Sequence, residues 1–136
     1  MIVLDSSFLI AYHNTRDVHH AAAARAMVHL VAGEWGQAVL LEYVFLEVVT
    51  VLKSRCGTAA AKELGAQLLD AREVDFISCS DFFPETLSTF QRDKGALSFT
   101  DAAIVTFARR DSKGYVATFD EDFQSVSGLT VIPRRR

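Results

Sequence analysis

The chain has 136 residues, of which 50% are hydrophobic and 23% charged, so the composition excludes wholesale disorder and favours one domain spanning residues 1–136. A formal net charge of −3 excludes the basic footprint of a general nucleic-acid binder but not an enzyme that acts on nucleic acid. There is no apolar run long enough for a membrane span and no signal-peptide pattern, so we expect a cytoplasmic protein with reduced cysteines and no membrane association.

Short apolar runs alternate with helical patterns along the whole chain. In order, they predict a strand at 2–4, helices at 8–12 and 17–31, a strand at 38–41, helices at 42–55 and 58–71, a strand at 74–78, helices at 84–93 and 99–110, and strands at 115–119 and 130–132. Ser6 and Ser7 are expected to cap the first helix and Thr58 the fourth. The alternation predicts an α/β fold with a parallel sheet covered on both faces.

Acidic residues gather at the edge of the sheet where the expected strands end. Ligands of open parallel sheets bind outside the carboxyl ends of the strands. The acids are Asp5 after the first strand, Glu47 in the helix after the second, Asp101 at the start of helix 99–110, and Asp120 with Asp122 after the fourth strand. We expect them to converge on one site.

Several of these acids also have a purely structural explanation. Asp5 can cap the helix that follows it. Asp101 forms a Ser-x-x-acid capping box with Ser98. Asp120 and Asp122 can be ordinary turn residues. For each of these residues taken alone, the structural role stays open.

Glu47 is harder to explain as a structural residue. It interrupts an apolar helix, and its neighbours three and four positions away include Val44 and Val51. A carboxylate on that face is costly to bury unless a positive group meets it. Glu42 is a weaker candidate, because five residues of helix turn it roughly 140° away from Glu47.

Clustered carboxylates are unfavourable without a cation. Two of them about 4 Å apart repel by roughly 4 kcal/mol at an effective dielectric constant of about 20. Hard oxygen ligands with few histidines favour Mg²⁺ or Mn²⁺ over zinc. An acidic pocket with one or two such ions is typical of phosphodiester hydrolysis, in which the ions activate water and stabilise the leaving oxygen.

Four segments of the chain together resemble the PIN-domain ribonucleases, the family of the VapC-type toxins of toxin–antitoxin pairs. They are 3–7 (VLDSS), 43–49 (YVFLEVV), 97–102 (LSFTDA) and 117–123 (ATFDEDF). They occur in the family's order with helices between them.

The resemblance assigns roles to these residues. It implies that the catalytic, metal-binding acids are Asp5, Glu47, Asp101 and Asp120, that Asp122 can share the fourth position, and that Ser6, Ser98 and Thr118 are supporting hydroxyls. Glu42 departs from the family, whose members often have a small polar residue there, and is expected to alter the rim of the pocket.

The resemblance also implies an architecture and partners. The expected fold is a three-layer α/β/α sandwich with four to five parallel strands, and the expected assembly is a homodimer. The implied activity is Mg²⁺- or Mn²⁺-dependent cleavage of structured RNA in the cytoplasm, with a VapB-type antitoxin as the inhibitory partner whose arginine meets the acids.

Two other functions remain as alternatives. One is a catalytically weak PIN module that acts by binding RNA or protein. The other is a receiver-type domain phosphorylated on Asp5, which the serines after Asp5 disfavour because such a domain needs a second acid there.

The remaining motifs have simpler interpretations. The closing arginines at 134–136 are expected to form a solvated tail. We expect Trp35 to make a packing or dimer contact. His13, His19 and His20 are expected to mark the surface start of a helix rather than a metal site, and Phe82, Phe83 and Phe90 to belong to the core.

Overall fold

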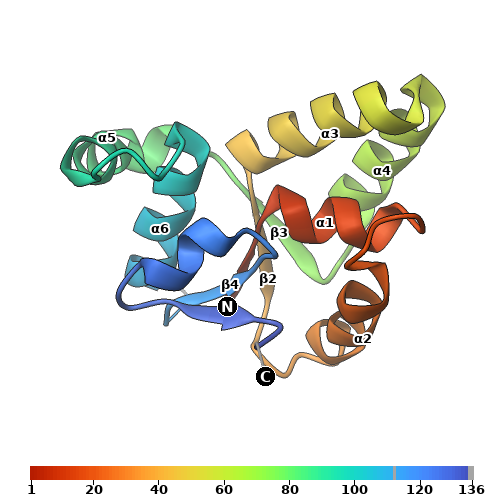
Figure 1. Cartoon of the computed structure of the whole chain (residues 1–136), viewed down its shortest axis with the longest axis horizontal. Helices are drawn as coiled ribbons and strands as arrows, with labels where there is room; N and C mark the ends of the chain where they lie inside the picture. The colour runs from red at the N-terminus through yellow and green to blue at the C-terminus, as the bar shows by residue number, and fades with distance from the viewer. Residues whose placement is uncertain (112, 135–136) are drawn as a thin grey trace.

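The fold is built on one parallel sheet, seen in the computed structural model of the chain (Figure 1). The structure describes residues 1–111 and 113–134, so Arg135 and Arg136 of the arginine run lie outside the described residues. The strands are β1 (Ile2–Leu4), β2 (Ala38–Leu41), β3 (Val74–Ile77), β4 (Tyr115–Ala117) and β5 (Thr130–Ile132). Their order across the sheet is β3-β2-β1-β4-β5, with every neighbouring pair parallel.

Pairs of helices connect the first four strands. They are α1 (Ser6–His13) with α2 (His20–Val31), α3 (Glu42–Cys56) with α4 (Thr58–Asp70), and α5 (Phe83–Arg92) with α6 (Phe99–Asp111). Connections between parallel strands are right-handed, and β4 lies across β1 from β2 and β3. Hence α1 to α4 cover one face and α5 and α6 the other (Figure 1). The expected α/β/α sandwich is confirmed.

The ends of three helices differ from the sequence prediction. Helix α1 begins at Ser6, and the hydroxyls of Ser6 and Ser7 bond to acidic side chains instead of capping the helix. Gly57, with a φ of 94°, takes the cap position expected for Thr58. Helix α2 begins at His20 instead of residue 17, because Asp17 Oδ1 accepts a hydrogen bond of 2.8 Å from His19 N and forms a turn.

The central strands form the core. Both faces of β1 and β2 are buried, as expected for inner strands of a covered parallel sheet. In the described part of the chain no helix is long and apolar enough to cross a membrane. Both cysteines are free thiols.

The phenylalanines near α5 do not all enter the core as predicted. Phe82, in the short 3-10 helix η1 (Ser80–Phe82), is fully buried and packs 5.7 Å from the Phe107 ring. Phe83 and Phe90 are 43% and 41% exposed. Their prediction as core residues is wrong, because α5 buries only one narrow face against α6 and turns these two rings outward.

The order of the strands fixes where a site can form. From β1 the chain continues towards β2, whereas β4 lies on the other side of β1 and is followed by the 3-10 helix η2 (Glu121–Ser125). The connections therefore diverge at the carboxyl ends of β1 and β4. Such a switch point leaves a crevice that loops and helix starts can line.

Replacing Phe82 with Ala should lower the free energy of unfolding by about 3–5 kcal/mol, because it empties a fully buried site. Phe83→Ala is the matched control and should cost about 1 kcal/mol or less, since its ring is already partly exposed. Urea unfolding followed by circular dichroism measures both. Equal losses for the two variants would contradict the placement of these rings.

Candidate active site

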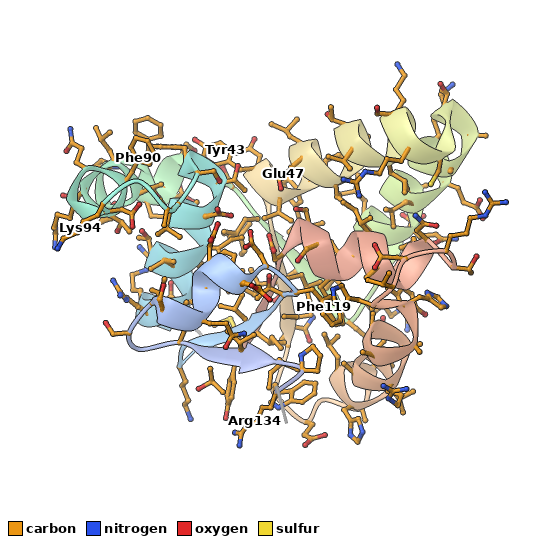
Figure 2. The ribbon with its side chains drawn as sticks, viewed as in Figure 1. Tyr43, Glu47, Phe90, Lys94, Phe119 and Arg134 are labelled. Atoms are coloured by element: carbon orange, nitrogen blue, oxygen red, sulfur yellow. The ribbon has the colours of Figure 1, made fainter. Side chains whose placement is uncertain are left out.

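A cleft of about 350 Å³ lies at the carboxyl edge of the sheet, where β1 and β4 diverge. Its acidic lining residues come from five separate segments of the chain and are Asp5, Asp17, Glu47, Asp101 and Asp120. In the view of Figure 2, Glu47 on α3 lies above α1 and Phe119 lies below it. The cleft therefore unites four of the five acids expected to converge on one site. We call them the cleft acids: Asp5, Glu47, Asp101 and Asp120.

Asp5 lies at the centre of this arrangement. It directly follows β1 and takes the N-cap position of α1, but its side chain makes no capping hydrogen bond. Instead, Oδ2 accepts hydrogen bonds from the hydroxyls of Ser7 (2.8 Å) and Thr118 (2.7 Å). Thr118 follows β4, so these bonds join the ends of two neighbouring strands through one carboxylate.

Glu47 enters the cleft from α3. It is half-buried, and its Oε1 accepts a hydrogen bond from the hydroxyl of Ser6. Val51 and Arg55, four and eight residues further on, line the same cleft, so one face of α3 supplies all three.

Glu42 points elsewhere. Its Oε1 accepts a hydrogen bond of 3.1 Å from the backbone N–H of Cys79 and so ties α3 to the chain after β3. Glu42 is not among the residues that line the cleft in the described structure. The expectation that it alters the rim is therefore wrong, and the helical phase that separates it from Glu47 is the reason.

Asp101 has both of the roles that the sequence left open: it caps a helix and it lines the cleft. Its backbone N–H donates to Ser98 Oγ and its Oδ2 accepts from Ser98 N, both at 3.1 Å, which is the reciprocal capping box at the start of α6. The side chain is also buried and lines the cleft. Ser98 thus supports Asp101 from outside the cleft lining.

Asp120 lies in the cleft and Asp122 does not. Asp120 caps η2, its Oδ1 accepting from Asp122 N at 2.9 Å, and its own N–H donates to Thr118 Oγ1 at 2.9 Å. Asp122 is exposed, and the cleft lining within residues 1–111 and 113–134 does not include it. The turn after β4 therefore aims the first of the two acids inward.

Burial in the cleft raises the proton affinity of two of the carboxylates, Asp5 and Asp101. Burial raises the pKa of Asp5, opposed by the hydrogen bonds from Thr118 and Ser7 and reinforced by the charge of Glu47. Burial also raises the pKa of Asp101 to about 6, with the charges of Asp5 and Asp120 adding to the effect against the Ser98 hydrogen bonds. The site holds negative charge that lacks full compensation, a condition typical of functional sites.

The donor set suits a hard divalent cation. Among residues 1–111 and 113–134 no three His, Cys, Asp or Glu side chains are grouped closely enough to form a ready-made metal cage. Mg²⁺ does not need one, because it keeps several of its waters and is commonly bound by one or two carboxylates. Four carboxylates that line one cleft, two of them buried with a raised pKa, therefore fit a hydrated Mg²⁺ or Mn²⁺ ion.

Sequence reasoning missed seven lining residues of the cleft, of which Ile10 and Val51 are apolar. The other five carry a polar group or an aromatic ring. They are Ser7, Asp17, His19, Arg55 and Phe119. The spacing of four residues from Glu47 to Val51 and from Val51 to Arg55 could have indicated Arg55. No sequence pattern indicated the place of His19, because the turn before α2 decides it.

The chain is similar to a known protein family and to a known ribonuclease. The family model of the PIN domain matches residues 2–129. A VapC ribonuclease from Archaeoglobus fulgidus is 29% identical over 51 residues, which cover 38% of this chain and 33% of that protein. The alignment thus spans about a third of that curated relative.

A solved structure agrees with the fold over nearly its whole length. The crystal structure of Mycobacterium tuberculosis VapC20, described as a toxin that cleaves the sarcin-ricin loop, superposes with a TM-score of 0.82 at 27% sequence identity. The match covers 95% of this chain and 97% of that one. With the family model matched along almost all of its residues, the chain belongs to the PIN domain family.

Proposed function

We propose that this protein is a divalent-metal-dependent endoribonuclease that hydrolyses RNA phosphodiester bonds. The observation that carries the proposal is the convergence of Asp5, Glu47, Asp101 and Asp120 on one cleft in a PIN domain. The similarity to a VapC ribonuclease and to a toxin that cleaves the sarcin-ricin loop supports RNA as the substrate class.

One or two Mg²⁺ or Mn²⁺ ions would be held by the cleft acids. Such ions activate a water molecule and stabilise the leaving oxygen of a phosphodiester. They would also offset the burial and the carboxylate repulsion that raise the pKa values of Asp5 and Asp101. With this charge neutralised, the anionic backbone of RNA can approach the cleft.

Hydroxyls orient Asp5 and Glu47 for this task, and the backbone N–H of Ser98 orients Asp101. Ser7 and Thr118 hold one oxygen of Asp5, Ser6 holds Glu47, and Ser98 holds Asp101 through the capping box. Each carboxylate is thus fixed by a donor on its own or a neighbouring segment. Arg55 lies on the same lining and supplies positive charge for a phosphate group.

We further propose that the protein is the toxin of a toxin–antitoxin pair and acts in the cytoplasm on structured RNA. The relative of known structure is a toxin, which supports this assignment. The inhibitory partner would be a VapB-type antitoxin that places an arginine among the cleft acids, where it would satisfy the same negative charge as the cation.

An apolar surface beside the cleft supports a homodimer. Tyr43, Phe83 and Phe90 surround Phe99 with ring centroids 5.5–6.0 Å away, and Leu46 next to them is 59% exposed. Figure 2 shows Tyr43 and Phe90 on the same side of the molecule. We propose that a second copy covers this surface, because exposed aromatic and aliphatic groups of this kind mark interaction sites.

A catalytically weak PIN module that only binds RNA or protein is the second candidate. It predicts RNA binding without turnover in any divalent cation. Cleavage of RNA in Mg²⁺ or Mn²⁺, abolished by EDTA, would exclude it. The intact set of four cleft acids favours the nuclease.

Replacing Asp101 with Asn should abolish RNA cleavage without unfolding the protein. The loss should exceed the roughly 10–100-fold that removal of a metal's outer-shell partner costs. Asp122→Asn is the matched control and should keep most of the activity, since Asp122 is exposed outside the cleft. Gel assays of RNA cleavage in Mn²⁺ measure both, and an active Asp101→Asn protein would contradict the role of this residue.

The same variant should be at least as stable as the wild type at neutral pH in EDTA. In the wild type, burial raises the pKa of Asp101 from 3.8 to about 6 in the folded state, so folding favours the protonated form. The cost of keeping ionised Asp101 in the folded protein is absent below pH 3.8 and complete above about pH 6. The free energy of unfolding of the wild type therefore falls across this interval, and that of Asp101→Asn falls less. Thermal melts from pH 4 to 7 test this sign.

Mg²⁺ or Mn²⁺ should raise the melting temperature of the wild type, because the ion binds only the folded state. At a metal concentration 100 times the Kd, the free energy of unfolding should rise by about 2.7 kcal/mol. Glu47→Gln should lose most of this gain. Glu42→Gln should keep it, because its carbonyl oxygen can still accept from Cys79 N. Differential scanning fluorimetry with and without metal measures the gain, and equal losses would show that Glu47 is not the inward-facing acid.

Phe90→Glu should convert the dimer to a monomer, because it places a charge in the apolar surface. Val28→Glu is the control, since Val28 is 69% exposed on α2, away from this surface. Light scattering coupled to size-exclusion chromatography gives the mass of each. A wild type that is monomeric at high concentration, or a dimeric Phe90→Glu protein, would refute the interface.

A further inference from the structure

Three aromatic rings form a column that leads from the core to the cleft. Phe8 is fully buried in α1, and the Phe119 ring is stacked on it with centroids 5.9 Å apart and an interplanar angle of 12°. The His19 ring is also stacked on Phe119, with centroids 4.5 Å apart and an angle of 6°. His19 is exposed, so the column ends in a flat ring that faces solvent.

Hydrogen bonds fix the backbone at Phe119 and at His19. The N–H of Phe119 donates to Ser7 Oγ at 2.9 Å, which is the same hydroxyl that bonds to Asp5. The N–H of His19 donates to Asp17 Oδ1 at 2.8 Å. The next residue, His20, is tied to Ala11 O through Nδ1 at 2.8 Å. The exposed ring is therefore positioned before any ligand arrives.

The column lies beside the reacting groups. His19 and Phe119 line the same cleft as the four cleft acids, and Phe119 stands in sequence between Thr118, which bonds to Asp5, and Asp120. Arg55 lines the cleft as well. A nucleotide bound here would have its phosphate among charged groups and its base within reach of a flat ring.

A nucleobase matches the chemistry of the column. The base is neutral and planar, so it does not suffer the repulsion that the acids exert on a phosphate. Every base has a π-face that can stack on an aromatic side chain, and this stacking is largely independent of sequence. Paired bases are already stacked within a helix, so the platform selects an unpaired nucleotide.

We propose that His19, backed by Phe119, is the stacking platform for one unpaired base next to the phosphodiester that is cut. The proposal rests on the proposed ribonuclease function and adds to it a residue that positions the substrate. His19 acts through its ring face, and its nitrogens have no part in the chemical step.

The test compares His19→Ala with His19→Phe in cleavage of hairpin RNAs that carry unpaired loop nucleotides. Under single-turnover conditions in Mn²⁺, His19→Ala should raise the half-saturating protein concentration by roughly 5- to 150-fold, the equivalent of about 1–3 kcal/mol for one stacked base. The maximal rate should change less than about threefold. His19→Phe should restore binding, because it keeps the ring without the nitrogens.

Abasic nucleotides, placed one at a time in the loop, identify the contacted base. At one position, the abasic RNA should bind the wild-type protein as weakly as intact RNA binds His19→Ala. That abasic RNA should bind His19→Ala no more weakly still, because both changes remove the same stacking contact. Val18→Ala is the control for the turn before α2, because Val18 is 89% exposed and does not line the cleft in the described structure.

The outcomes separate this proposal from the ribonuclease function. Loss of activity in His19→Phe equal to that in His19→Ala would overturn the proposal and assign the role to the imidazole nitrogens. Unchanged binding by His19→Ala would overturn it as well. If the wild type cuts no RNA, the ribonuclease proposal fails, and fluorescence anisotropy of the same RNAs still decides whether His19 stacks a base.

Discussion

The gathering of four carboxylates in one cleft, two of them buried, is the constraint on which the rest of the site depends. Parallel strands deliver their carboxyl ends to one edge, and the divergence of β1 and β4 brings Asp5 and the turn with Asp120 together there. Glu47 and Asp101 add charge from α3 and α6. Burial, reinforced by neighbouring carboxylates, then raises the pKa of Asp5 and Asp101. The proposed cation would offset this cost.

The fold meets this cost with neutral donors placed on rigid elements. Hydroxyls of α1 and of the residue after β4 bind Asp5, so the carboxylate also joins two strands. Asp101 is fixed by the capping box that starts α6. Neutral donors hold a carboxylate in position and leave its charge available, whereas an arginine or lysine at the same place would neutralise it.

Three neighbouring features of the cleft region suit three different ligands. The acids, with a cation, suit the phosphodiester; the stacked rings of Phe8, Phe119 and His19 suit a base; and the apolar surface around Phe99 suits a second protein copy. The stacked rings share α1 with Ser6 and Ser7, which bond to the acids, and the apolar surface shares α3 and α6 with Glu47 and Asp101. Changes in one region can therefore be felt in the others through common elements.

The sequence by itself determined the elements and the chemistry of the acids. Alternation of apolar runs with helical periods predicted the parallel sheet, and a carboxylate on the apolar face of α3 predicted the inward direction of Glu47. Only the tertiary structure decided that Asp120 rather than Asp122 enters the cleft and that Ser7 bonds to Asp5. Turn geometry and contacts between distant segments carry no periodic signal, and for the same reason no pattern in the chain could place His19 on Phe119.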